Sequence, residues 1–181
     1  MTPTAVLIID VQWGLFVGPP DAYRGPETIA KINALIAHAR DRDLPVIFVQ
    51  HDGAHESAIE PESEGWRLHP ALHRQAQDIV VRKTASDAFD RTALAAQLDA
   101  RGVRRLLIAG YATEFCVDTS VRRAASLGYD AILVADAHTT KDRPTLTAEQ
   151  IIAHHAWVLH HLDCPEHPIR VVKLDDNDWS A

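Results

Sequence analysis

The apolar residues of this chain fall into six short runs, and the segments between them have helical spacing. The first run, Ala-Val-Leu-Ile-Ile-Asp at 5–10, is a continuous apolar stretch that a polar residue closes. Such runs are typical of strands buried on both faces of a parallel sheet. The other five predicted strands lie at 46–50, 79–82, 105–110, 131–135 and 169–174.

Between the predicted strands, apolar residues recur every three or four positions. Gly25-Pro26 opens one such segment, and Leu44-Pro45 closes the unit. Further helices are predicted at 92–101, at 114–127 after Thr113 as N-cap, and from the capping-box sequence at Thr147 to His161. Strands alternating with helices predict an α/β fold: a three-layer αβα sandwich around a six-stranded parallel, doubly wound sheet. We expect residues 1–181 to form a single domain.

A long loop is predicted from His51 to about Pro70. It is rich in Gly, Pro, Glu and His. Loops of this length in a compact domain are usually functional or partly disordered.

Composition and charge narrow the classes of function. The net charge of −7 over 181 residues gives no electrostatic basis for binding nucleic acid. No apolar run approaches the roughly 18 residues of a membrane span, and the run at 5–9 is too short for a signal sequence. Two cysteines, Cys116 and Cys164, cannot form a disulfide framework, so we expect a cytoplasmic protein.

Three residues with matched chemistry are predicted to lie on one rim of the sheet. Asp10 ends the first predicted strand, Lys83 follows the third, and Cys116 lies just after the fourth. Ligands of open parallel sheets bind at the carboxyl ends of the strands, which is where these three residues meet. Cys116 would attack, Asp10 would transfer protons, and Lys83 would stabilise both charges.

The position of Cys116 predicts an activated thiol. If Thr113 is the N-cap, Cys116 is the third helical residue, where free N–H groups and the helix dipole favour an anion. We expect these groups and Lys83 to outweigh Asp10 and to lower the pKa of the thiol below about 8.5. The same N–H groups could hold the oxyanion of a tetrahedral intermediate.

Each of these residues also has an ordinary interpretation, and two other functions stay open. Asp10 could be a loop residue, Lys83 a solvated side chain and Cys116 a small core residue. A catalytically silent binding or subunit module would need no triad. A redox-sensing thiol protein would need a resolving cysteine, and Cys116 has no Cys-x-x-Cys partner.

The chain resembles the isochorismatase-like cysteine hydrolases, the superfamily that includes nicotinamidase and N-carbamoylsarcosine amidase. The resemblance rests on four segments: Asp10-Val-Gln12, Lys83 with Phe89, Gly110-Tyr-Ala-Thr-Glu-Phe-Cys-Val-Asp118, and Val134-Ala-Asp136 with Thr139. It implies hydrolysis of a small amide-like substrate with Asp10, Lys83 and Cys116 as the triad. It also implies a cis peptide before Ala112, with the amides of Ala112 and Cys116 as the oxyanion hole.

The metal site of the nicotinamidases is not expected here. Gly53 stands where the resemblance would place a metal-binding histidine. His69 and His73 are four residues apart, a spacing that could place two ligands on one helix face, but with His55 they are interpreted as surface residues. We therefore expect no metal and no cofactor. The predicted partners are a small-molecule substrate and a second copy of the chain in a homodimer or larger homo-oligomer, with no nucleic acid and no membrane. The predicted substrate-binding residues are Gln12, Trp13, Trp66, Tyr111 and Phe115.

Overall fold

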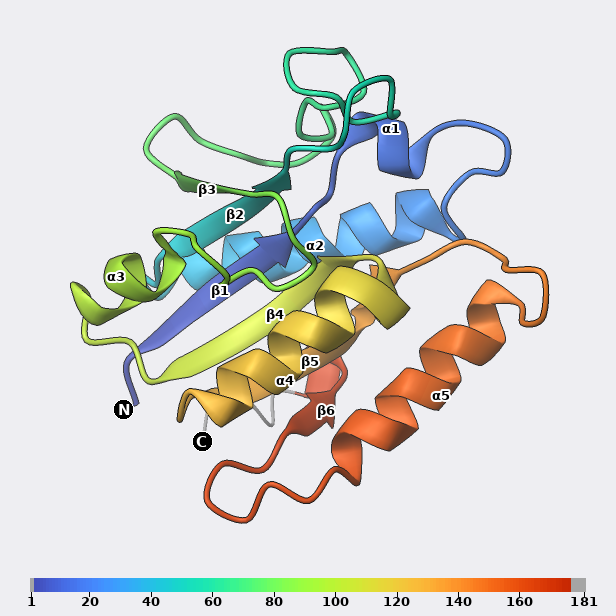
Figure 1. Ribbon diagram of the computed structural model, residues 1–181. Coiled ribbons are helices and arrows are strands. Elements are labelled where there is room, and N and C mark those ends of the chain that lie inside the picture. The colour runs from blue at the N-terminus through green and yellow to red at the C-terminus, as the bar shows by residue number, and fades with distance from the viewer. Residues whose placement is uncertain (1, 177–181) are drawn as a thin grey trace.

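The computed structural model describes residues 2–176 and builds them around one six-stranded sheet (Figure 1). The strands are β1 (Thr4–Ile9), β2 (Val46–His51), β3 (Ile79–Lys83), β4 (Arg105–Tyr111), β5 (Asp130–Thr139) and β6 (Arg170–Val172). All pairings are parallel, and the strand order is β3-β2-β1-β4-β5-β6. The predicted α/β class and doubly wound parallel sheet are confirmed. The order reverses at β1 and β4, which is where such sheets bind ligands.

Helices cover both faces of the sheet (Figure 1). They are α1 (Trp13–Phe16), α2 (Gly25–Arg40), α3 (Leu94–Asp99), α4 (Asp118–Ser126) and α5 (Ala148–His160). Alternate residues of β1 enter two different cores. Val6 and Ile8 pack with α2, whereas Leu7 and Ile9 pack with α3 and α4. This division explains why β1 is apolar from Ala5 to Ile9, since both of its faces are covered there.

Local sequence signals set the ends of two of these helices. Pro26 lies in the first turn of α2, where its missing N–H has no intrahelical partner to lose. The predicted capping box of α5 is present, because the Thr147 hydroxyl accepts from the Gln150 N–H and the Gln150 side chain accepts from the Thr147 N–H. In residues 2–176 no helix is long and apolar enough to span a bilayer.

The segment between β2 and β3 contains no further strand or helix, as predicted, but it is held by many turns. It also returns to the start of the chain, where Gln12 and Leu68 form an antiparallel bridge. The loop therefore closes over the carboxyl ends of β1 and β2, next to the predicted rim residues.

Candidate active site

The end of β1 turns Asp10 toward the middle of the sheet edge. Asp10 adopts a left-handed backbone conformation, with φ of 51°, directly after the last strand residue. Such a conformation is uncommon for a residue other than glycine, and it is often found at functional sites. Its side chain is only 1% exposed.

Gly110 lets β4 approach β1 at the same edge. Its φ is +129°, and a Cβ on it would lie 2.1 Å from the Ile9 carbonyl oxygen. Only glycine fits this position, so the strand can bring the following residues, Tyr111 and Ala112, beside Asp10. The peptide bond between Tyr111 and Ala112 is cis, as the family resemblance implied.

A π-helical turn, Thr113–Val117, carries the cysteine. The Val117 N–H donates to the Ala112 carbonyl five residues earlier, at 3.2 Å, and α4 begins only at Asp118. The prediction of Thr113 as N-cap of a regular helix is wrong. Its hydroxyl is hydrogen-bonded instead to His138 Nδ1, at 2.9 Å. Cys116 therefore lies before the regular helix rather than in its first turn.

The ammonium group of Lys83 is the centre of the site. Its Nζ lies 2.7 Å from Asp10 Oδ2 and donates to Cys116 Sγ at 3.1 Å, to His51 Nδ1 at 2.8 Å and to the Ala85 carbonyl at 2.9 Å. The Lys83 side chain is fully buried. The three residues predicted to share one rim thus converge on one point, although they lie more than thirty positions apart in the sequence.

Asp10 is paired with Lys83 but has few hydrogen bonds. The distance between Lys83 Nζ and Asp10 Oδ2 is that of an ion pair, but the two groups are not aligned for a hydrogen bond. Within the described residues neither carboxylate oxygen has a well-aligned hydrogen-bond donor. An oxygen of Asp10 and the Cys116 sulfur lie within 4.8 Å of each other. The carboxylate therefore keeps acceptor capacity beside the thiol.

The prediction of a lowered thiol pKa is wrong in direction. Burial, and then the Asp10 carboxylate, raise the pKa of Cys116 to about 12, and the opposing effect of Lys83 is smaller. The physical reason is desolvation, because Cys116 is only 8% exposed and a thiolate there loses most of its hydration. The thiol form is accordingly favoured over the thiolate at neutral pH.

The backbone beside Cys116 offers a free donor. In the described part of the chain the N–H of Ala112 donates to no acceptor. It lies at the end of β4, immediately before the π-helical turn that carries the thiol. An unused N–H at this position has the character of an oxyanion-hole donor.

His51 is a fourth residue of the site, and sequence analysis did not assign it a role. It ends β2, and its Nδ1 lies 3.6 Å from Asp10 Oδ2 and 3.9 Å from Cys116 Sγ. Of these side chains it is the most exposed, at 21%. Its position at the carboxyl end of β2 could have identified it. The rule that ligands bind at the carboxyl ends of parallel strands applies to His51 as it does to Asp10.

The predicted substrate-binding residues have varied surroundings. Gln12 is a correction: its amide is fully buried, and it bonds to both backbone groups of His51 and to the Trp66 carbonyl. It therefore braces the site and does not face a substrate. The Trp66 indole donates to Asp52, and Arg82 covers one of its faces at 5.0 Å from the ring centroid. Trp66 anchors the loop, and its contact with substrate stays a prediction.

The other three predicted substrate-binding residues are aromatic side chains of α1, β4 and the π-helical turn. Tyr111 is buried against Phe16, with ring centroids 5.6 Å apart, and Trp13 packs on His69 at 5.2 Å. Phe115, next to Cys116 in sequence, is 52% exposed and is covered on one face by Arg143. Their contact with a substrate is a prediction that the geometry leaves open.

The residues present do not fit a metal ion. In residues 2–176 one group of possible ligands is close enough, namely Asp10, His51 and Cys116, and the Lys83 ammonium already lies among their three ligand atoms. Gly53 offers no ligand, and a Cβ there would lie 2.3 Å from Ser57 Oγ. The cationic group at this site is a lysine.

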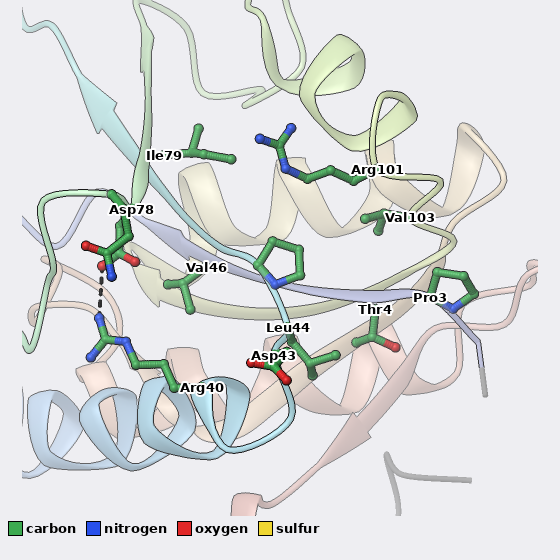
Figure 2. Close-up of a pocket in the computed structure, with 12 residues that line it drawn as sticks. Pro3, Thr4, Arg40, Asp43, Leu44, Val46, Asp78, Ile79, Arg101 and Val103 are labelled. Carbon is green, nitrogen blue, oxygen red and sulfur yellow. Dashed lines mark hydrogen bonds and ion pairs between the residues drawn. The ribbon is translucent and has the colours of Figure 1, made fainter.

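A hollow of about 680 Å³ lies at the opposite, amino-terminal edge of the sheet (Figure 2). Its lining includes Pro3, Arg40, Asp78 and Arg101, and it contains none of the residues around Cys116. Its only ion pair drawn in the figure joins Arg40 to Asp78. It has neither a cysteine nor a histidine in its lining, so its size does not make it the candidate active site.

Comparison with known proteins gives consistent matches. A family model described as the isochorismatase domain matches residues 4–159. A streptothricin hydrolase of Streptomyces noursei is 36% identical over 140 residues, which cover 77% of this chain and 51% of that protein. A ureidoacrylate amidohydrolase, RutB, of Variovorax paradoxus strain S110 is 33% identical over 170 residues, which cover 74% of this chain and 68% of that protein. The chain thus spans about half the length of the streptothricin hydrolase.

Solved structures share the fold. The crystal structure of an isochorismatase family protein has a TM-score of 0.86 at 36% identity and covers 96% of this chain and 99% of its own. An isochorismatase from Pseudomonas putida KT2440 has a TM-score of 0.85 at 28% identity, with 96% and 89% of the two chains covered.

Proposed function

Because the chain belongs to the isochorismatase family, we propose that it is a cysteine hydrolase that cleaves the C–N bond of a small amide-like substrate. The reaction would pass through a thioester on Cys116. The observation that carries this function is the single ammonium group of Lys83 in contact with both the Asp10 carboxylate and the Cys116 sulfur, at 2.7 and 3.1 Å. Two of the relatives are named hydrolase or amidohydrolase, which is consistent with this chemistry.

The raised pKa of the thiol is consistent with a first step in which proton transfer accompanies attack. A neutral Cys116 gives its proton to Asp10 as the sulfur attacks the amide carbonyl carbon, so charge does not build up on sulfur alone. The carbonyl oxygen becomes an oxyanion, and the unused Ala112 N–H is a suitable donor to it. The ammonium group of Lys83 offsets the negative charge wherever it lies in this buried site.

The remaining steps return the proton. Asp10 delivers it to the leaving nitrogen as the tetrahedral intermediate collapses, which releases an amine or ammonia and leaves a thioester. Asp10 then takes a proton from water as the water attacks the thioester. Collapse of the second intermediate releases the acid, and the proton returns to sulfur. No metal is needed, since the nucleophile is a side chain and not a metal-bound water.

A panel of small amides and ureas tests this function. We expect ammonia or amine release by the unaltered protein from at least one compound, with an acyl adduct on Cys116 in intact-mass spectra of a quenched reaction. Cys116→Ala should abolish both signals, and Cys164→Ala should leave both unchanged because Cys164 lies outside the site. Turnover that survives in Cys116→Ala would contradict the proposal. Sulfenic acid on Cys116 with no adduct would favour the redox alternative.

A further inference from the structure

His51 is held by its backbone and by one ring nitrogen. Gln12 brackets its peptide groups, because Gln12 Oε1 accepts from the His51 N–H and Gln12 Nε2 donates to the His51 carbonyl, each at 2.9 Å. The ring nitrogen Nδ1 lies 2.8 Å from Lys83 Nζ. Both the backbone and the ring are therefore fixed relative to the nucleophile.

The contact with Lys83 determines the tautomer of His51. A lysine ammonium group can only donate hydrogen bonds, so Nδ1 must accept with its lone pair. A ring proton is then on Nε2. The opposite ring flip would direct a carbon-bound hydrogen at the ammonium group, which is unfavourable.

The outward side of the ring is free. Within residues 2–176 the Nε2 atom has no hydrogen-bond partner, and the atom is not among the buried, unpartnered ones. Nδ1 and Nε2 point in nearly opposite directions from the ring, so a proton on Nε2 points away from Lys83. Donation by the cation into Nδ1 also polarises the ring and strengthens the Nε2–H as a donor.

From this geometry we propose that His51 contacts the substrate and selects amides whose acyl group carries an acceptor oxygen, a carboxylate or carbonyl, near the scissile carbon. The inference rests on the proposed function for its substrate, but the donor itself is a property of the site. Nδ1 lies only 3.9 Å from Cys116 Sγ, so the donor on the far side of the same ring is one ring width further from the sulfur, within reach of a substituent on the acyl group.

Two substitutions of His51 separate the role of Nδ1 from the role of Nε2. His51→Asn keeps an acceptor near the Nδ1 position, facing Lys83, and removes the outward donor. His51→Gln keeps an amide N–H near the Nε2 position and removes the acceptor. A residue that only fills space would respond equally to both changes.

Alkylation of Cys116 by iodoacetate and by iodoacetamide tests the proposal without any amide substrate. The two reagents have the same size, and iodoacetate carries the stronger acceptor. In His51→Asn the ratio of the iodoacetate rate to the iodoacetamide rate should fall about tenfold, the effect of one hydrogen bond to a charged group. In His51→Gln the ratio should stay within about threefold. Equal ratios in all three proteins, or an equal fall in both variants, would overturn the proposal.

A measurement on the unaltered protein covers the case in which the variants do not fold. Long-range ¹H–¹⁵N correlation spectra distinguish the two neutral histidine tautomers. The proton of His51 should be on Nε2, and a proton on Nδ1 would overturn the proposal. If the unaltered protein turns over none of the amides and ureas, the proposed function fails, whereas the alkylation ratios and the tautomer still decide the role of His51.

Discussion

Two buried carboxylates at opposite edges of the sheet have similar cationic partners and different surroundings. At the amino edge, Asp78 pairs with Arg40 at 2.9 Å (Figure 2). It also accepts the Gln75 N–H at 2.6 Å. At the carboxyl edge, Asp10 pairs with Lys83, and neither of its oxygens has an aligned donor. A carboxylate that already accepts hydrogen bonds is structural, whereas one with unused acceptor capacity beside a thiol can take a proton. The large hollow beside Asp78 therefore does not identify the reactive carboxylate.

The largest effect should separate the two carboxylates by activity. Asp10→Asn removes the proposed acceptor of the thiol proton, and we expect kcat/KM to fall about a thousandfold. Asp78→Asn, the matched change at the other edge, should change kcat/KM less than about twofold. Steady-state hydrolysis of any substrate found in the amide panel measures both. A similar loss in the two variants would remove the distinction.

His138 is a third buried ionisable group, and it lies outside the proposed catalytic triad. His138 is 3% exposed, its Nε2 has no partner among the described residues, and burial lowers its pKa to about 4 from 6.5. His155 also lowers this pKa, and Asp136 raises it. The unfolded chain therefore binds more protons between the two pKa values, and stability should fall by about 3 kcal/mol as the pH drops from 6.5 to 4.

Urea unfolding at pH 7 and pH 4 measures this loss. His138→Asn retains a polar atom for Thr113 but does not titrate. Between pH 7 and pH 4 its free energy of unfolding should therefore fall by about 3 kcal/mol less than that of the unaltered protein. An identical fall in the two proteins would show that His138 is not the group responsible.

At the amino edge the expected effect is on stability alone. Asp78→Asn leaves Arg40 without its charged partner and weakens the bond to the Gln75 N–H, so the free energy of unfolding should fall by about 1–2 kcal/mol. Arg40→Ala should give a similar loss, and the double variant should lose less than the sum. Additive losses in urea unfolding would contradict a coupled pair.

The smallest effect is expected for Arg101, which lines the same hollow (Figure 2). Among residues 2–176 its guanidinium bonds only within its own segment, to the carbonyl and side chain of Gln97, both at 2.8 Å. Arg101→Ala should change the free energy of unfolding by less than about 0.5 kcal/mol and leave kcat/KM unchanged. A clear loss of activity would indicate that the amino-edge hollow has a function of its own.

The sequence predicted those features that depend on strand ends. Asp10, Lys83 and Cys116 could be grouped because parallel strands bring their carboxyl ends to one edge. The doubly wound parallel class of the sheet and the capping box at Thr147 could likewise be predicted, because both follow from patterns along the sequence.

Other features depend on packing between distant segments, which no local pattern displays. The role of Gln12 was predicted wrongly because its amide is buried only when the loop of residues 52–78 returns over it. The Thr113 cap was wrong because His138, 25 residues later, takes the hydroxyl. The pKa of Cys116 was predicted in the wrong direction because the cost of burial depends on the surrounding tertiary structure.

The pH dependence of Cys116 alkylation by iodoacetamide tests most directly whether the three residues act as one unit. The thiolate alone reacts, so the midpoint of the profile follows the ionisation of the thiol. Asp10→Asn removes a charge that raises the pKa and should move the midpoint to lower pH, whereas Lys83→Ala should move it to higher pH. The predicted result is a midpoint below that of the unaltered protein for Asp10→Asn and above it for Lys83→Ala. Three coincident profiles would contradict a shared proton among Asp10, Lys83 and Cys116.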